Sequence, residues 1–211
     1  RGLGQSGKPE TEYTMADYAD DAAGLLDALG WEPVPVMGVS FGGMVAQELT
    51  LRHPEKVSAL VLACTSSGGK GGASYPLHEL EALDEEARAE RSLVLADTRR
   101  DEAWRAANPE KWQSYLELAL AARRADRDVA GAARQLAARA GHDTWSRLPA
   151  IDVPVLLTGG RYDGIAPVAN MEALAARIPG AELKLYAGGH LFLVQDKSAY
   201  PDIIQWVSSN I

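Results

Sequence analysis

The apolar positions of the chain follow two spacings that alternate along it. Over residues 14–29 they recur every three or four positions, which predicts a helix with one buried face and Thr14 as its N-cap. Continuous apolar runs at 34–40 and 57–64 predict buried strands, and residues 41–54 between them have helical composition. Strands joined through a helix run parallel, so this part of the chain predicts a parallel sheet.

The pattern changes after the second strand. Residues 65–74, TSSGGKGGAS, are rich in glycine, and we expect a flexible connection there. Residues 78–147 then show helical spacing with charged outer faces and no strand pattern. This stretch predicts a helical subdomain inserted into the sheet fold.

Alternating strand and helix patterns return in the last third of the chain. The predicted elements are, in order, a strand at 152–160, a helix at 168–180, a strand at 181–189 and a helix at 198–210. The sequence therefore predicts an α/β fold with a mostly parallel sheet and a helical insertion. We divide it into a first core part at 1–74, the insertion at 75–148 and a second core part at 149–211.

Composition limits the partners and the compartment. With 211 residues and 46% hydrophobic residues, the chain can bury the core of one α/β domain with an insertion. The net charge of −8 argues against nucleic acid and anionic membrane surfaces as partners. No apolar run reaches the ~18 residues of a membrane span. The single cysteine, Cys64, suits a reducing compartment, so we expect a cytoplasmic protein.

The first candidate for chemistry is GVSFGG, residues 38–43, which fits G-x-S-x-G and lies between a predicted strand and a predicted helix. A sharp turn there would hold Ser40 in a strained conformation with its hydroxyl exposed, and we expect Gly38 and Gly42 to supply the clearance. The helix that follows directs its first N–H groups, beginning with that of Phe41, at a developing anion. An incidental serine in a glycine-rich turn is the alternative, and the position between strand and helix favours a nucleophile.

A serine nucleophile needs a base, and the chain has four histidines. His190 directly follows a predicted strand and two glycines, which places it at the edge of the sheet where catalytic groups gather. His53 lies in the last turn of a helix, and His78 and His142 lie in the insertion. His190 is therefore the predicted base.

The base in turn needs a carboxylate to orient it. Asp163 follows another strand, in the loop GGRYDGIAP. Asp152 enters that strand from its opposite end, and Asp196 is better placed to serve the last helix. The resulting chain order of nucleophile, acid and base, Ser40, Asp163 and His190, is one of the known orders of the catalytic triad.

Other motifs do not indicate a cofactor. Gly2, Gly4 and Gly7 match G-x-G-x-x-G, but no strand precedes them and no apolar helix follows, as a dinucleotide site requires. In SSGGKGG, Lys70 is followed by glycine where a phosphate loop has serine or threonine. No group of histidine, cysteine and carboxylate residues has metal-ligand spacing, so the sequence predicts neither a cofactor nor a metal site.

Together these motifs resemble the α/β-hydrolase family, and most closely its capped esterase, lactonase and enol-lactone-hydrolase members. GVSFGG resembles the nucleophile elbow, VPVLLTGGRYDGIAP the acid loop and YAGGHLFLVQD the histidine loop. The opening RGLGQSGKP resembles the family's R-G-x-G-x-S loop, so its glycines are expected to shape a turn near the active-site rim. The resemblance covers nearly the whole chain.

The resemblance implies a serine hydrolase that cleaves a small ester or lactone through an acyl-enzyme on Ser40. The insertion would form a lid, and the backbone N–H of Phe41 would be one oxyanion donor. Candidate pocket residues are Phe41, Trp145, Ile165 and Leu191. A cofactor-free haloperoxidase or perhydrolase and a carbon–carbon bond hydrolase would use the same triad. A non-catalytic ligand-binding relative or an inactive fragment is the alternative of another class.

Family members carry further strands ahead of the RGLGQSG loop, together with the segment that supplies the second oxyanion donor. The resemblance therefore implies that the strand at 34–40 has a bare apolar edge in this chain, which invites pairing. We expect a missing N-terminal segment or another copy of the chain to cover that edge.

Overall fold

The computed structural model describes residues 1–31, 33–124 and 128–211, and its centre is a parallel sheet of four strands. The strands lie in the spatial order β1 (Val34–Val39), β2 (Val57–Ala63), β3 (Val155–Gly160) and β4 (Glu182–Tyr186). Every neighbouring pair is parallel, as the alternation of strand and helix patterns indicated. The predicted α/β class is confirmed.

The helices are α1 (Met15–Leu29), α2 (Phe41–Arg52), α3 (Glu85–Ala96), α4 (Glu102–Ala107), α5 (Pro109–Arg124), α6 (Val129–Ala140), α7 (Val168–Arg177), α8 (Phe192–Gln195) and α9 (Ala199–Ser209). Short 3-10 turns occupy 54–56, 69–71, 77–82 and 148–150. Thr14 caps α1 in a capping box with Asp17, so the predicted start of that helix is correct. Within the described ranges, no helix has the length and apolar character needed to cross a bilayer.

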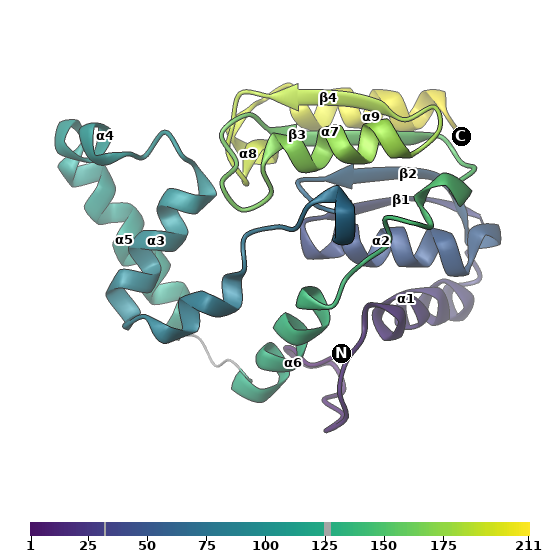
Figure 1. Cartoon of the computed structure of the whole chain (residues 1–211), viewed down its shortest axis with the longest axis horizontal. Coiled ribbons are helices and arrows are strands. Elements are labelled where there is room, and N and C mark those ends of the chain that lie inside the picture. Colours follow the sequence, from purple (N-terminus) through teal and green to yellow (C-terminus); the bar gives the residue numbers. More distant parts are fainter. Residues whose placement is uncertain (32, 125–127) are drawn as a thin grey trace.

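The sheet is buried on both faces along its two central strands. On one face, Leu60, Leu62 and Leu157 contribute to a cluster that includes residues of α1, α2 and α7. On the other face, Val61 and Leu156 pack against residues of α9, a helix that Figure 1 shows beside β4. Because successive side chains of a strand point to opposite faces, the buried runs of β2 and β3 serve both clusters.

β1 is less well covered than the two central strands. It lies at the end of the strand order, so one of its edges has no neighbouring strand among the described residues. Met37 pairs in register with Val61 and therefore points to the α9 face, yet it is 37% exposed, and Val39 on the same face is 41% exposed. The bare apolar strand expected from the sequence is present.

Helices α3 to α6 come between β2 and β3 in the chain. Figure 1 shows α3, α4 and α5 beyond the carboxyl ends of the strands, whereas α6 lies nearer to the N-terminus of the chain. The insertion predicted from the spacing is helical in all its described long elements.

The expectation of a flexible connection at 65–74 is wrong. Ser67 is completely buried, and Gly68 forms an isolated antiparallel bridge with Asp143. A Cβ atom on Gly68 would overlap the carbonyl oxygen of His142. The glycines of this segment therefore permit a close approach of two backbones, which the sequence pattern cannot distinguish from flexibility.

Candidate active site

Ser40 lies in the sharp turn between β1 and α2. Its φ of 54° is in the left-handed region, which is unusual for a residue with a side chain. Two hydrogen bonds from neighbouring structure hold it there: Ser40 N–H donates to the carbonyl of Ala63 at 2.8 Å, and the hydroxyl of Thr65 donates to the carbonyl of Ser40 at 2.8 Å. The end of β2 therefore supports the strained turn.

The glycines around Ser40 differ in what they do. A Cβ atom on Gly38 would overlap the carbonyl oxygen of Gly42 and lie 2.7 Å from the Cβ of Ala46, so the strand and the helix approach too closely for a side chain. The clearance expected from Gly42 itself is not needed, because a Cβ there would meet nothing within 4 Å. Gly43 is the second restricted position, since its Cβ would lie 2.6 Å from the Cβ of Thr65.

The fold brings together the three side chains that the sequence singled out. The Nε2 atom of His190 lies 2.9 Å from Ser40 Oγ, and the Nδ1 atom lies 2.8 Å from Asp163 Oδ2. Ser40 follows β1, Asp163 follows β3 and His190 follows β4. All three lie at the carboxyl edge of the sheet because parallel strands end at the same side.

Asp163 is held as an acceptor on both oxygens. Its side chain is fully buried, and Oδ1 accepts hydrogen bonds from the backbone N–H groups of Ile165 and Ala166, each at 2.8 Å. The other oxygen faces His190. An ionised carboxylate cannot donate, so the Nδ1 atom of His190 must carry the proton and Nε2 is left to accept one from Ser40.

Comparison with known proteins identifies the family of this chain. The family model described as alpha/beta hydrolase fold matches residues 1–197. This chain belongs to the α/β-hydrolase family. A poly(3-hydroxyalkanoate) depolymerase from Ectopseudomonas oleovorans is 32% identical over 205 residues, which cover 96% of this chain and 70% of the depolymerase.

Solved structures give the same result for this hydrolase. A hydrolase from Pseudomonas aeruginosa PA01 superimposes with a TM-score of 0.74 at 25% identity, covering 98% of this chain and 76% of the other. Est816, described as an N-acyl homoserine lactone degrading enzyme, superimposes with a TM-score of 0.75 at 26% identity, covering 97% and 79%. Both comparisons span the sheet and the inserted helices.

The remaining candidate residues of the hydrolase lie elsewhere. His53 pairs with a carboxylate of α1, His78 is exposed, and His142 is buried away from these three side chains, in the segment that returns to the core. Asp152 is exposed at the start of the third strand, and Asp196 accepts hydrogen bonds at the start of α9. None of these side chains hydrogen-bonds to Ser40, Asp163 or His190 in the described part of the chain.

Of the predicted pocket residues, Phe41, Ile165 and Leu191 lie near triad residues in the chain, whereas Trp145 does not. Phe41 is the first residue of α2, where the backbone N–H has no carbonyl partner within the helix, and its ring packs edge-to-face on Tyr18 at 5.0 Å. Ile165 lies in the acid loop, and Leu191 is 54% exposed beside His190. Trp145 instead packs against the main core cluster and under a guanidinium of α7, so its contacts do not connect it with the triad.

Cys64 is a close neighbour of the site that the motifs did not identify. Its sulfur, one carboxylate oxygen of Asp163 and one ring nitrogen of His190 all lie within 4.8 Å of one another. Burial, with the nearby charge of Asp163, raises the pKa of the thiol to about 12. A protonated thiol is a poor metal ligand, and both nitrogens of His190 already have partners. The position of Cys64 directly after β2 was the signal that could have placed it here.

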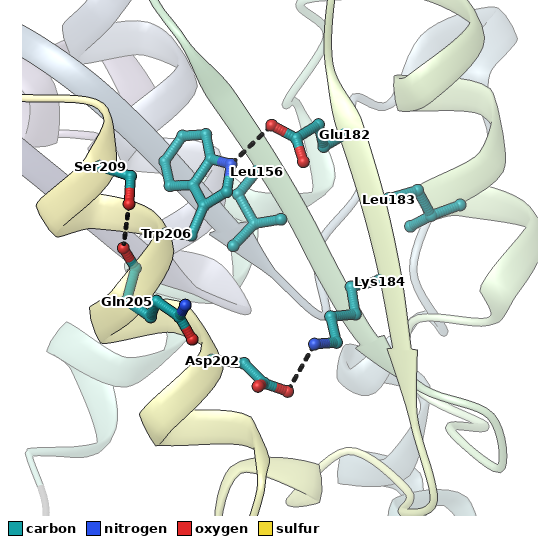
Figure 2. Close-up of a pocket in the computed structure, with 8 residues that line it drawn as sticks. All are labelled: Leu156, Glu182, Leu183, Lys184, Asp202, Gln205, Trp206 and Ser209. Atoms are coloured by element: carbon teal, nitrogen blue, oxygen red, sulfur yellow. Dashed lines mark hydrogen bonds and ion pairs between the residues drawn. The ribbon is translucent and has the colours of Figure 1, made fainter.

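A separate pocket of about 380 Å³ lies between β4 and α9. Figure 2 shows its polar side chains paired with one another: Trp206 Nε1 donates to Glu182 at 2.7 Å, and Lys184 pairs with Asp202 at 2.6 Å. None of the triad residues lines it. Its charges are already satisfied, so this pocket does not compete with the Ser40 site as the place of chemistry.

Proposed function

We propose that this protein is a serine hydrolase that cleaves carboxylic esters or lactones through an acyl-enzyme on Ser40. The observation that carries the proposal is the hydrogen-bonded series Ser40, His190 and Asp163, with Ser40 in a strained turn at the start of a helix. The relatives named as a poly(3-hydroxyalkanoate) depolymerase and an N-acyl homoserine lactone degrading enzyme support this substrate class.

In the acylation step, Ser40 Oγ attacks the carbonyl carbon while His190 Nε2 takes the hydroxyl proton. The carbonyl oxygen becomes an anion, which the N–H of Phe41 and the positive end of α2 stabilise. As the tetrahedral intermediate collapses, the carbon–oxygen bond to the leaving group breaks. The Nε2 proton then passes to the departing alkoxide, and Asp163 stabilises the imidazolium while it carries both protons.

In the deacylation step, His190 acts in the same two roles on water. Nε2 takes a proton from a water molecule as its oxygen attacks the acyl carbon, and the second tetrahedral anion occupies the same donors. Collapse breaks the bond to Ser40 Oγ, which recovers its proton from Nε2. The carboxylic acid leaves, and the hydrogen bonds of the resting site are restored.

We also propose that residues 75–148 form the lid of this site. The end of α3 hydrogen-bonds to both the acid loop and the histidine loop, which supports a position over the triad. Phe41, Ile165 and Leu191 flank the triad and are the proposed pocket residues. The family resemblance implies a second oxyanion donor besides the N–H of Phe41.

The test compares wild type, Ser40→Ala and the control Ser114→Ala, whose hydroxyl donates to a backbone carbonyl on an exposed face of α5. With p-nitrophenyl acetate and butyrate, we expect Ser40→Ala to lower kcat by at least about a thousandfold, because removing a triad serine leaves only binding and oxyanion stabilisation. Ser114→Ala should retain wild-type turnover. Equal turnover by Ser40→Ala and wild type would contradict the nucleophile assignment, and the absence of wild-type turnover on esters and lactones would contradict the substrate class.

A further inference from the structure

The loop that carries His190 is fastened to the end of α3. His190 N–H donates to the carbonyl of Ala96 at 2.7 Å, and Gly189 N–H donates to Gln195 Oε1 at 2.7 Å. The amide of Gln195 also donates from Nε2 to Asp97 Oδ2 at 3.0 Å. A Cβ on Gly189 would lie 2.8 Å from the Cα of Asp97, so the two backbones are in direct contact.

Asp97 determines which way the side-chain amide of Gln195 is turned. It is 3% exposed, and its carboxylate accepts hydrogen bonds from Arg99 Nε at 2.9 Å and Nη2 at 2.6 Å. Burial alone would raise the pKa of Asp97, but the hydrogen bonds from Arg99 and the charges of Arg99 and Arg100 together outweigh it, and the pKa is lowered. The carboxylate is therefore an acceptor only, so the Gln195 amide must turn its NH₂ toward Asp97 and its carbonyl toward Gly189.

The same end of α3 also touches the acid loop. Gly164 N–H donates to the carbonyl of Leu95 at 2.9 Å, and Thr98 N–H donates to the carbonyl of Tyr162 at 2.9 Å. The guanidinium of Arg99 lies 4.6 Å from the centre of the Tyr162 ring. One segment, 95–99, therefore joins the loops that present the acid and the base.

We propose that Gln195 is a positioning residue, which holds His190 within reach of Ser40 by linking Gly189 to Asp97. This inference rests on the proposed function. Removing the amide would leave the Gly189 N–H without its acceptor and Asp97 without one of its donors, so the histidine loop would shift or loosen. A displacement of about 1 Å can lower turnover about a hundredfold, although substrate binding need not change.

The first experiment compares Gln195→Ala with Gln113→Ala, whose amide donates to Glu117 on an exposed face of α5. With p-nitrophenyl butyrate we expect Gln195→Ala to lower kcat about 10- to 100-fold, with KM within about twofold of wild type. Gln113→Ala should match wild type in both constants. Thermal unfolding of each variant identifies a temperature at which all are folded, and the assays are run there.

Exchanging the amide and the carboxylate between positions 195 and 97 tests whether the lost turnover can be rescued. In Gln195→Glu, two carboxylates face each other. In Asp97→Asn, the new NH₂ must face a donor of either Gln195 or Arg99. We therefore expect each single variant to lower kcat about 10-fold or more. In the double variant, the new amide at position 97 can donate to the new carboxylate at position 195, which still accepts from Gly189, but its NH₂ also faces Nη2 of Arg99, which shares that oxygen in wild type. We therefore expect its kcat to exceed that of either single variant without reaching the wild-type value, which a purely additive loss would not allow.

Two results would overturn the inference: wild-type kcat for folded Gln195→Ala, or a folded double variant no more active than the weaker single variant. The Ser40→Ala assay separates this failure from failure of the proposed function. A readout independent of turnover is the proton NMR signal of the His190 Nδ1–H, assigned by its loss in His190→Ala. It should broaden or shift in Gln195→Ala and recover in the double variant; an unchanged signal in Gln195→Ala would also contradict the inference.

Discussion

His142 makes folding of this protein depend on pH. It is 5% exposed, and neither ring nitrogen has a hydrogen-bond partner of good geometry among the described residues. Burial lowers the pKa of His142 from 6.5 to about 4, and the positive charge of Arg147 acts in the same direction. The negative charges of Glu48 and Asp143 would raise the pKa, but burial outweighs them. Between pH 4 and pH 6.5, His142 is protonated in the unfolded chain but not in the folded one, so acid favours unfolding.

We therefore expect the free energy of unfolding to fall by about 2 kcal/mol between pH 7.5 and pH 5 through this residue alone. The measurement is urea unfolding of wild type and His142→Leu at both pH values. The variant should lose that part of the pH dependence, whereas the exposed control His78→Leu should keep it. Identical pH dependence in wild type and His142→Leu would show that His142 is not protonated on unfolding.

Among individual residues, the sequence identified those that lie beside strand ends. Ser40, Asp163 and His190 each follow an apolar run directly, and turn signals mark where each run ends. Gln195 and Cys64 were not predicted as neighbours of the site. The position of Cys64 directly after β2 was a usable signal, whereas the role of Gln195 depends on which backbone and side chain face it across the fold, and no local pattern carries that information.

Among the elements, β1 and α2 meet at a junction that leaves no room for a side chain at Gly38. Gly38→Ala would force its Cβ into the carbonyl of Gly42, so α2 must shift, and overpacking of this kind costs about 1–3 kcal/mol. Gly42→Ala is the matched control, since a Cβ there meets nothing within 4 Å and alanine favours helix. Urea unfolding should show the first variant destabilised and the second unchanged or stabilised.

The turnover of Gly38→Ala and Gly42→Ala is a second test of this junction. Because Gly38 precedes the turn that holds Ser40, Gly38→Ala should also lower kcat, whereas Gly42→Ala should affect it less. If both variants unfolded at the wild-type urea concentration, the close approach of strand and helix would be contradicted. Sequence reasoning assigned the clearance to both glycines, because the motif gives their spacing without showing which neighbour each one meets.

For the whole molecule, the sequence predicted the number of described strands and their mostly parallel direction, since buried apolar runs joined through helices favour a parallel sheet. It did not predict that residues 65–74 lie packed against the segment returning from the insertion. That contact joins Gly68 to Asp143 across the whole insertion, and loop composition alone cannot reveal it.

The exposed strand β1 leads to a prediction about assembly. Its outer edge carries unpaired backbone groups, and Met37 and Val39 leave an apolar surface beside that edge. Two copies related by a twofold axis could pair their β1 strands antiparallel and cover both surfaces at once. We therefore expect the 211-residue chain to associate with itself, which light scattering after size-exclusion chromatography would detect as a mass that rises with concentration.

Met37→Lys should shift that equilibrium toward the monomer, because a lysine on each copy places like charges at the pairing edge. Ile204→Lys is the control, since Ile204 is also an apolar residue, 62% exposed, but belongs to α9 and not to β1. Association that is lost in the first variant and kept in the second places the contact at β1. A monomeric wild type at every concentration would rule out a second copy as the cover for this strand.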